Sequence, residues 1–139
     1  MRGERVVHWM VDAILMSLPP APSAATTARS AITQGLSQRV TIDLLEDVRL
    51  LLTELITNAL RHADMTPDDQ IGVKAELSQG IVRIEVSDPG RDGPVEVRAP
   101  GPRGGGYGLL LVDRLTDQWG VDRRDGTMVW AELSAGPAR

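Results

Sequence analysis

The sequence predicts a two-layer α+β sandwich. Two pairs of segments with alternating apolar residues, each pair joined by a turn that contains Gly, are typical of β-hairpins. Segments whose apolar residues have helical spacing come before and between these hairpins. The 139 residues contain no internal repeat and no interdomain linker, and this length suits one domain. We therefore expect residues 1–139 to form a single domain in which helices pack against a sheet.

The N-terminal part of the chain is expected to hold strands and then a helix. Residues 5–18 are rich in Val, Ile, Met and Leu and end before two prolines, which favours one strand or two short strands, with a helix as the competing interpretation. Ser23 or Thr26 is expected to cap a first helix that continues to about Gln38. The inner face of that helix is predicted to consist of Ala28, Ile32 and Leu36.

The longest predicted helix comprises residues 43–63. This segment contains no Pro or Gly, and Asp43 followed three residues later by Glu46 has the spacing of a capping box. Its apolar residues recur every three or four positions, as expected for a helix with one buried face. That face is predicted to consist of Leu45, Val48, Leu52, Leu55, Ile56, Ala59, Leu60 and Ala63.

The same helix carries a polar stripe. Glu54, Asn58 and His62 stand at positions i, i+4 and i+8, so they lie on one side of the helix, with Thr57 and Arg61 beside them. A carboxylate one turn from a carboxamide can serve as a base beside a metal ligand. For the stripe considered alone, a solvated helix face is the alternative interpretation.

A hairpin and a loop are predicted after the central helix. Apolar residues alternate on both sides of a turn at residues 78–80, which predicts a hairpin over residues 71–87. The second strand leads into Asp88-Pro89-Gly90. Residues 94–103 are rich in Pro, Gly and charge, and they are expected to form a mobile surface loop.

The last part of the chain is predicted to hold a glycine-rich segment, a helix and a second hairpin. Residues 104–108 open the helix, and residues 118–122 and 127–133 form the hairpin strands, with a turn at 123–126. The apolar row of the helix is predicted to consist of Leu109, Val112, Leu115 and Trp119.

The glycine-rich segment has the spacing G-x-G-x-G in front of a helix. Glycine lets the backbone approach a ligand closely and a helix start offers free N–H groups, so phosphate is the natural ligand. Considered alone, a flexible turn without a ligand explains the segment equally well. It is not a P-loop, because that motif needs a Lys after its last Gly and Lys74 is the only Lys. It is also a poor dinucleotide-binding fingerprint, because no strand–helix–strand unit follows it.

Two further residues have both a structural and a functional interpretation. Asp88 stands where a strand leaves the sheet, so it either forms an Asx turn or accepts a hydrogen bond from a ligand amino group. In the second case Gly90 leaves space for a flat ring. Thr127, which follows Gly126 at the start of the last strand, has the same ambiguity because Thr is common in strands.

Composition excludes several classes of function. The net charge of −4 argues against nonspecific nucleic-acid binding. The chain has no Cys, which removes disulfides and thiolate chemistry, and two His residues make a His-rich metal site a poor interpretation. No apolar segment approaches the roughly 18 residues that span a bilayer, and charged residues interrupt any signal-peptide pattern near the N-terminus. We therefore expect a cytoplasmic protein that does not bind membranes.

The order of the motifs carries a resemblance to a known family. An E-L-x-x-N-A-x-x-H-A helix is followed by D-x-G, a Pro- and Gly-rich loop, G-x-G-x-G-L-x-L-V and G-T-x-V. This order resembles the ATP-binding domain shared by histidine kinases, gyrase B, Hsp90 and MutL. The residues that match its four motifs are Glu54, Asn58, Ala59, His62, Asp88, Gly90, Gly104, Gly106, Gly108, Leu109, Leu111, Val112, Gly126 and Thr127.

Within this family the chain most resembles the stand-alone anti-sigma-factor serine/threonine kinases. It is short, the helix motif reads N-A-L-R-H-A, and the segment between the glycine motifs is short. The sequence departs from the family at Arg91-Asp92-Gly93, where a Gly is expected two residues after Gly90, and this departure concerns the anchoring of the loop. The resemblance implies a mixed, mostly antiparallel sheet with helices on one face.

The resemblance also implies an activity and partners. It implies an ATP- and Mg²⁺-dependent serine/threonine protein kinase that holds a sigma factor inactive and phosphorylates a Ser of an antagonist protein. An unphosphorylated antagonist would release the sigma factor. A homodimer is compatible with the resemblance, since family members are often dimers. The alternative function is a nucleotide-dependent binding switch without kinase activity, and a more remote one is an interaction domain that binds no nucleotide.

The family motifs suggest roles for individual residues. Asn58 would bind Mg²⁺ through its amide oxygen, and Glu54 would act as the base. Asp88 would bind the adenine amino group, with support from the Thr127 hydroxyl. The backbone of Gly104, Gly106 and Gly108 would surround the phosphates. Arg61, His62 and Arg103 are the candidates for transition-state charge, although a structural role for His62 is favoured.

Overall fold

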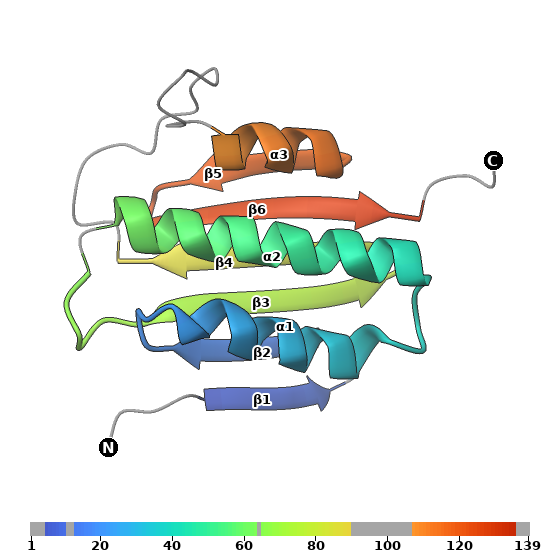
Figure 1. Ribbon diagram of the computed structural model, residues 1–139, viewed down its shortest axis with the longest axis horizontal. Helices are drawn as coiled ribbons and strands as arrows, with labels where there is room; N and C mark the ends of the chain where they lie inside the picture. The colour runs from blue at the N-terminus through green and yellow to red at the C-terminus, as the bar shows by residue number, and fades with distance from the viewer. Residues whose placement is uncertain (1–4, 11–12, 64, 90–106, 136–139) are drawn as a thin grey trace.

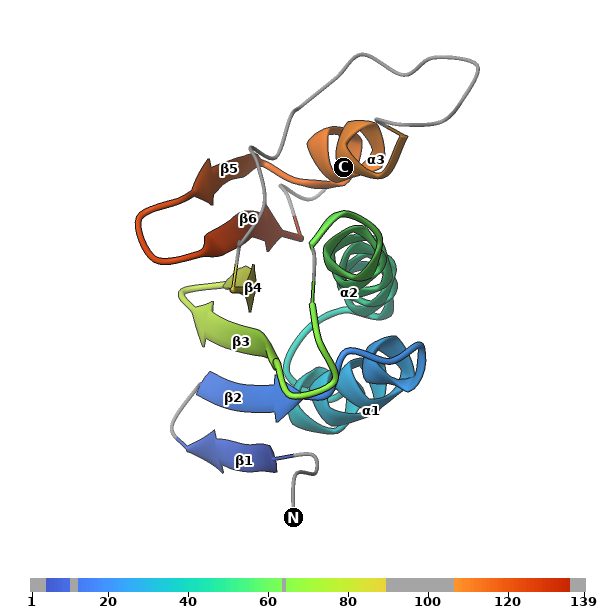
Figure 2. The same cartoon turned by 90° about the vertical axis from the view of Figure 1, so that its left-hand side faces the viewer.

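A computed structural model describes residues 5–10, 13–63, 65–89 and 107–135. Along the chain lie β1 (Arg5–Met10), β2 (Ala13–Leu18), α1 (Ser23–Leu36), α2 (Ile42–His62), β3 (Ile71–Ser78), β4 (Ile81–Asp88), α3 (Tyr107–Leu115), β5 (Gln118–Asp122) and β6 (Thr127–Ser134). The strands form a 6-stranded sheet in the order β1-β2-β3-β4-β6-β5. The three helices lie against one face of this sheet (Figures 1 and 2). The predicted two-layer α+β sandwich is therefore confirmed.

Every pairing between the described strands is antiparallel, so the parallel pairs of the expected mixed sheet do not occur among them. The connections explain this result. Helices α1 and α2 form a hairpin between β2 and β3, which returns the chain to the edge that it left, so β3 runs back along β2. Helix α3 lies between β4 and β5 in the sequence. These two strands run in the same direction, but β6 separates them in the sheet.

The core lies between the sheet and the helical layer. Alternate residues of β2, β3 and β4 are buried, as their sequence pattern predicts. Burial of each large aliphatic side chain contributes about 1.5–3 kcal/mol. Helix α2 supplies a large share of this core and lies between α1 and α3, so its position is firmly fixed (Figure 1). Its buried residues are Leu44, Val48, Leu51, Leu52, Leu55, Ile56 and Ala59.

The helix caps differ from the predicted ones. Helix α2 begins at Ile42 because the Thr41 hydroxyl accepts a hydrogen bond from the Leu44 backbone N–H at 3.2 Å. The predicted capping box at Asp43 is therefore wrong, although a carboxylate in the first turn still interacts favourably with the helix dipole. Helix α1 follows Pro22 at its N-cap without a side-chain cap hydrogen bond, so a cap at Ser23 or Thr26 is also wrong.

Both predicted hairpins are confirmed, and one residue changes its element. Gln79 and Gly80 have φ angles of 51° and 78° between β3 and β4, and a two-residue turn with two positive φ angles matches the twist of such strands. Trp119 belongs to β5 and not to the apolar row of α3, because α3 ends at Leu115. Its indole Nε1 donates a hydrogen bond to Asp113 Oδ1 at 2.9 Å, which joins the start of β5 to α3.

Candidate functional site

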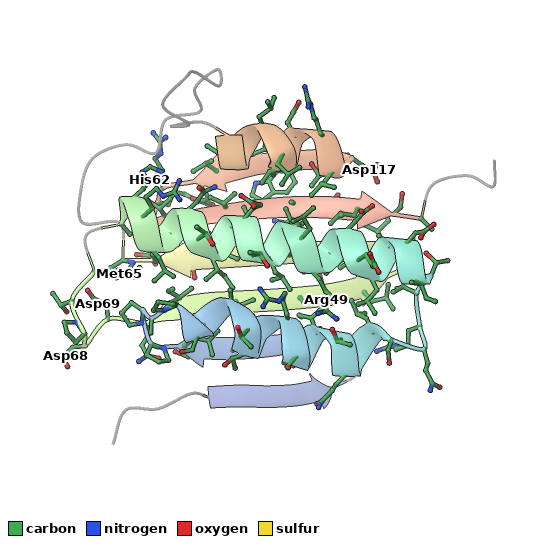
Figure 3. All side chains as sticks on the ribbon, in the orientation of Figure 1. Arg49, His62, Met65, Asp68, Asp69 and Asp117 are labelled. Atoms are coloured by element: carbon green, nitrogen blue, oxygen red, sulfur yellow. The ribbon has the colours of Figure 1, made fainter. Side chains whose placement is uncertain are left out.

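The described residues of the predicted motifs lie along one edge of the sandwich, which we call the motif edge. Helix α2 and strand β4 end there, whereas α3 and β6 begin there (Figure 1). His62 is the last residue of α2 and lies at this edge in Figure 3. Ends of elements that are far apart in the sequence therefore lie at the same edge.

Asp88 and Thr127 are direct partners in the register of β4 and β6. Thr127 is 6% exposed and is the only buried polar residue in the part of the chain that the structure describes. It shares one face of β6 with Ala131 and Leu133, which belong to the core below the helices. Because partners in register point to the same face, the side chains of Asp88 and Thr127 leave the sheet next to each other, toward the helical layer.

Gly126 makes this pairing sterically possible. Its φ of +80° is a conformation that other residues rarely adopt. A Cβ atom at this position would also collide with the backbone carbonyl oxygen of Asp88 and would come within 2.9 Å of the Pro89 carbonyl oxygen. The glycine before the last strand is thus required for the close approach of β6 to the end of β4.

One atom of the Asn58 side chain is buried without a hydrogen-bond partner in the part of the chain that the structure describes. This atom is Nδ2. Buried polar groups are nearly always hydrogen-bonded, so such a group near a functional edge suits a ligand. Rotation of the amide by half a turn would present Oδ1 at the same place, and oxygen is the ligand atom that Mg²⁺ prefers. The half-buried Glu54 lies one turn earlier on α2.

The rotation of α2 can be deduced from its contacts with α1. Arg49 Nη1 donates a hydrogen bond to Thr33 Oγ1 of α1 at 3.3 Å, so this flank of α2 faces α1. Asn58 follows Arg49 by nine residues, about two and a half turns, and therefore lies on the opposite flank. That flank is the one next to α3 (Figure 1), where Leu109 and Val112 are buried. The polar stripe accordingly faces the helix that follows the second glycine motif.

Of the other predicted site residues, some lie in described elements and some lie outside the described residues. Arg61 and His62 occupy the last turn of α2 at the motif edge, with exposed side chains. Gly108 is the second residue of α3. Gly90, Gly104, Gly106 and Arg103 lie outside the described residues, as does the predicted loop at residues 94–103.

A cavity of about 540 Å³ lies at the turn between β5 and β6 and is lined by Asp122, Arg124, Asp125 and Met128. Met128 follows Thr127 on β6, so its side chain points to the opposite face of the sheet. This cavity is therefore on the other face of the sheet from the candidate site residues Asp88 and Thr127.

Two further features of the described residues concern groups of metal-binding side chains and helices that could span a membrane. Within them, no group of three or more His, Cys, Asp or Glu side chains is arranged to hold a metal ion. Mg²⁺ commonly takes only one or two protein ligands together with phosphate oxygens and water, and Asn58 fits that use. In the same ranges no helix is both long and apolar enough to cross a membrane.

Comparison with known proteins agrees with this arrangement. A family model described as a histidine kinase-like ATPase domain matches residues 18–133, which include all the predicted site residues. The serine-protein kinase RsbW of Listeria monocytogenes serotype 4a is 30% identical over 123 residues, which cover 78% of each protein. The serine-protein kinase RsbW of Oceanobacillus iheyensis is 26% identical over 133 residues, which cover 85% of this chain and 84% of that protein.

A solved structure has a similar fold. The histidine kinase domain of the blue-light activated histidine kinase from Erythrobacter litoralis EL346 matches with a TM-score of 0.54 at 24% sequence identity. The match covers 84% of this chain and 61% of that chain, so the present chain spans less than two thirds of that protein. Together, the fold, the motif edge and the match over residues 18–133 lead to one conclusion: the chain belongs to the histidine kinase-like ATPase domain family.

Proposed function

We propose that the protein is an ATP- and Mg²⁺-dependent serine/threonine protein kinase that also acts as an anti-sigma factor. The observation that carries this proposal is the buried Nδ2 atom of Asn58, which has no hydrogen-bond partner among the described residues and lies on the flank of α2 that faces α3. The similarity to proteins named serine-protein kinases supports a hydroxyl group as the acceptor. The kinase and partner-binding functions are assigned to one domain, residues 1–139.

Asp88 and Thr127 would bind the base of the nucleotide. The Asp88 carboxylate would accept a hydrogen bond from the adenine amino group, and the neighbouring Thr127 hydroxyl would add a second polar contact. The burial of Thr127 supports this role, because a side chain that is 6% exposed is held in place beside Asp88. Gly126 would keep the two side chains close together.

Asn58 and Glu54 would carry the metal contact and the proton transfer. Mg²⁺-ATP supplies a phosphoryl group whose charge the metal helps to neutralise. Asn58 would hold the metal through Oδ1. Glu54, one turn away on the same flank, would take the proton from the hydroxyl of the substrate Ser at a carboxylate oxygen. Since α2 is anchored in the core, both groups would keep a constant separation.

The remaining motif residues would surround the phosphates. Backbone N–H groups of Gly104, Gly106 and Gly108 would donate hydrogen bonds, helped by the start of α3. Arg61 and Arg103 are proposed as the sources of positive charge near the transferred phosphoryl group, whereas a structural role is favoured for His62. The exposed positions of Arg61 and His62 at the end of α2 leave them accessible to a nucleotide.

The partners follow from the same proposal. The protein would hold a sigma factor inactive and would phosphorylate a Ser of an antagonist protein, whose unphosphorylated form would release the sigma factor. These interactions would take place in the cytoplasm, and the protein would act as a monomer or a homodimer.

A phosphate-transfer assay tests the proposal. The purified protein is incubated with radiolabelled ATP, Mg²⁺ and each small candidate antagonist protein of the source organism. Phosphoserine on one antagonist is the expected result. ATP binding without phosphate transfer to any antagonist would replace the kinase by a nucleotide-dependent binding switch. The absence of a thermal shift with ATP would contradict both.

A further inference from the structure

Helix α3 starts at the motif edge, and hydrogen bonds hold it near its other end. The indole Nε1 of Trp119 in β5 donates a hydrogen bond to Asp113 Oδ1 of α3 at 2.9 Å. The backbone N–H of Asp117, just after the helix, donates to the Glu132 carbonyl oxygen of β6 at 2.8 Å. Figure 3 shows Asp117 at the end of the sandwich opposite to His62. We call these two hydrogen bonds the α3 clamp.

The side chain of Trp119 reaches from the sheet to α3. Trp119 is the register partner of Ala131, which is fully buried below the helices, so its indole lies on the same face of the sheet. The indole is partly buried and packs against the core. A large rigid ring with an N–H group at its edge can fix both the distance and the rotation of a neighbouring helix.

The shortness of α3 makes it dependent on such contacts. The helix has 9 residues, and isolated helices shorter than about 12–15 residues are marginal in water. Leu109 and Val112 are buried and attach one face of α3 to the core. Burial of apolar surface has no preferred direction, whereas a hydrogen bond weakens steeply when its angle changes. The clamp therefore adds orientation to an attachment that burial already provides.

The length of α3 turns a small change at the clamp into a larger change at the motif edge. Nine residues rise about 13 Å along the helix axis, so a tilt of about 10° around the clamped end moves the other end by roughly 2 Å. A misplacement of about 1 Å can lower the rate of catalysis about 100-fold. The backbone N–H groups at the start of α3 would thus lose their alignment with a phosphate if the clamp opened.

We propose that Trp119 and Asp113 are positioning residues for the phosphate end of the nucleotide site, because the hydrogen bond between them sets the tilt of α3. The inference rests on the proposed function, since it takes the N–H groups at the start of α3 as phosphate ligands. Neither residue touches the nucleotide in this arrangement. The proposed base-binding residues Asp88 and Thr127 belong to β4 and β6, so their register does not depend on the clamp.

A comparison of two ligands tests this role, because ATP has phosphates and adenosine has none. Dissociation constants of ATP with Mg²⁺ and of adenosine are measured for the parent, Trp119→Phe, Asp113→Ala and Asp113→Asn. Phe keeps an aromatic ring without the N–H donor, and Asn keeps an acceptor oxygen. Trp130→Phe, on the opposite face of the sheet, and Arg114→Ala, at an exposed position of α3, are matched controls. Melting temperatures verify that each variant is folded.

A spectroscopic measurement follows the clamp itself. The indole N–H resonance of Trp119 is assigned by its absence from the NMR spectrum of Trp119→Phe. It should shift when ATP and Mg²⁺ bind, because coupling between two sites is reciprocal. Adenosine should shift it much less. Shifts of equal size with ATP and adenosine would contradict a connection between the clamp and the phosphates.

We expect Trp119→Phe and Asp113→Ala to bind ATP about 2- to 10-fold more weakly than the parent, the effect of one lost hydrogen bond. Their affinity for adenosine should be unchanged, and Asp113→Asn and both controls should bind both ligands like the parent. An equal loss of affinity for ATP and adenosine, or no loss for either, would overturn the positioning role but not the proposed function. Failure of the parent to bind ATP would overturn the proposed function and this inference with it.

Discussion

Asp88 at the end of β4 and Thr127 at the start of β6 are direct partners across the sheet, on the face that the helices cover. Two residues 39 positions apart thereby form one polar site, and the distance between their strands depends on the residue just before Thr127. The geometry of this pair leads to the first two predictions.

Replacement of Gly126 by Ala should destabilise the protein and abolish nucleotide binding. The positive φ alone costs a residue with a Cβ about 1–2 kcal/mol, and the collision with the Asp88 carbonyl adds to this cost. Gly80→Ala is a matched control, because Gly80 has a φ of +78° with nothing within 4 Å of its Cβ position. Chemical denaturation should show a larger loss for Gly126→Ala than for Gly80→Ala. Equal losses of unfolding free energy in the two variants would mean that small backbone shifts remove the collision without a further loss of stability.

Replacement of Asp88 by Ala should remove the thermal shift caused by ATP. A ligand at 100 times its dissociation constant stabilises a protein by about 2.7 kcal/mol, which is a shift of several degrees for a domain of this size. The proposed hydrogen bond to the adenine amino group is lost in this variant. Asp125→Ala, on the nearby turn, serves as the control for loss of an exposed carboxylate. A normal ATP shift in Asp88→Ala would show that the base binds elsewhere.

The turn between β5 and β6 should show a pH dependence at acid pH. Hydrogen bonds from Arg124, among them one from Nη2 at 2.6 Å, lower the pKa of Asp122 from 3.8 to about 2. Because the folded pKa is below the unfolded one, the pair's contribution to stability is present above about pH 4 and is lost as the pH falls toward 2. The contribution is small, since the pair is at the surface.

An NMR titration of the Asp122 carboxyl group measures this effect. In Arg124→Gln the pKa of Asp122 should rise toward 3.8, whereas Arg114→Gln should leave it at about 2. A pKa that stays near 2 in Arg124→Gln would assign the shift to other groups.

The sequence predicted the elements better than the contacts between them. Periodicity identified α2 and both hairpins, because buried faces repeat with the geometry of each element. The caps were missed, since Thr41 and Asp43 are both good cap residues and only the backbone conformation decides between them. The side-chain hydrogen bonds between α1 and α2 were not predicted either. They join residues 24 and 16 positions apart, and they depend on how the two helices are rotated about their axes.

The candidate site was predicted through ordered motifs, and the structure adds its geometry where the residues are described. Sequence alone could name Asp88 and Thr127, but their register depends on all the pairs of β4 and β6. The missing partner of Asn58 Nδ2 could not be foreseen, because it depends on the side chains that surround α2 in three dimensions.

Asn58 should be replaceable without loss of stability in the absence of nucleotide. Its buried Nδ2 makes no hydrogen bond among the described residues, so Asn58→Ala removes an unsatisfied polar group and should leave the melting temperature unchanged or higher. Thr57→Ala, one residue earlier, serves as a control for truncation at a half-buried position of the same helix. A marked loss of stability in Asn58→Ala would indicate a structural role instead of a ligand role.

Glu54 and Asn58 should differ in the step that they affect. Glu54→Gln keeps the size of the side chain and removes the proposed base, so ATP should still bind while phosphate transfer falls by about 10²–10⁴-fold. Asn58→Ala removes the proposed metal ligand, so the Mg²⁺-dependent affinity for ATP should fall together with transfer. Titrations with and without Mg²⁺, combined with a single-turnover assay, separate the two effects. Transfer at the parental rate in Glu54→Gln would exclude Glu54 as the base, and an unchanged Mg²⁺ dependence in Asn58→Ala would exclude Asn58 as the metal ligand.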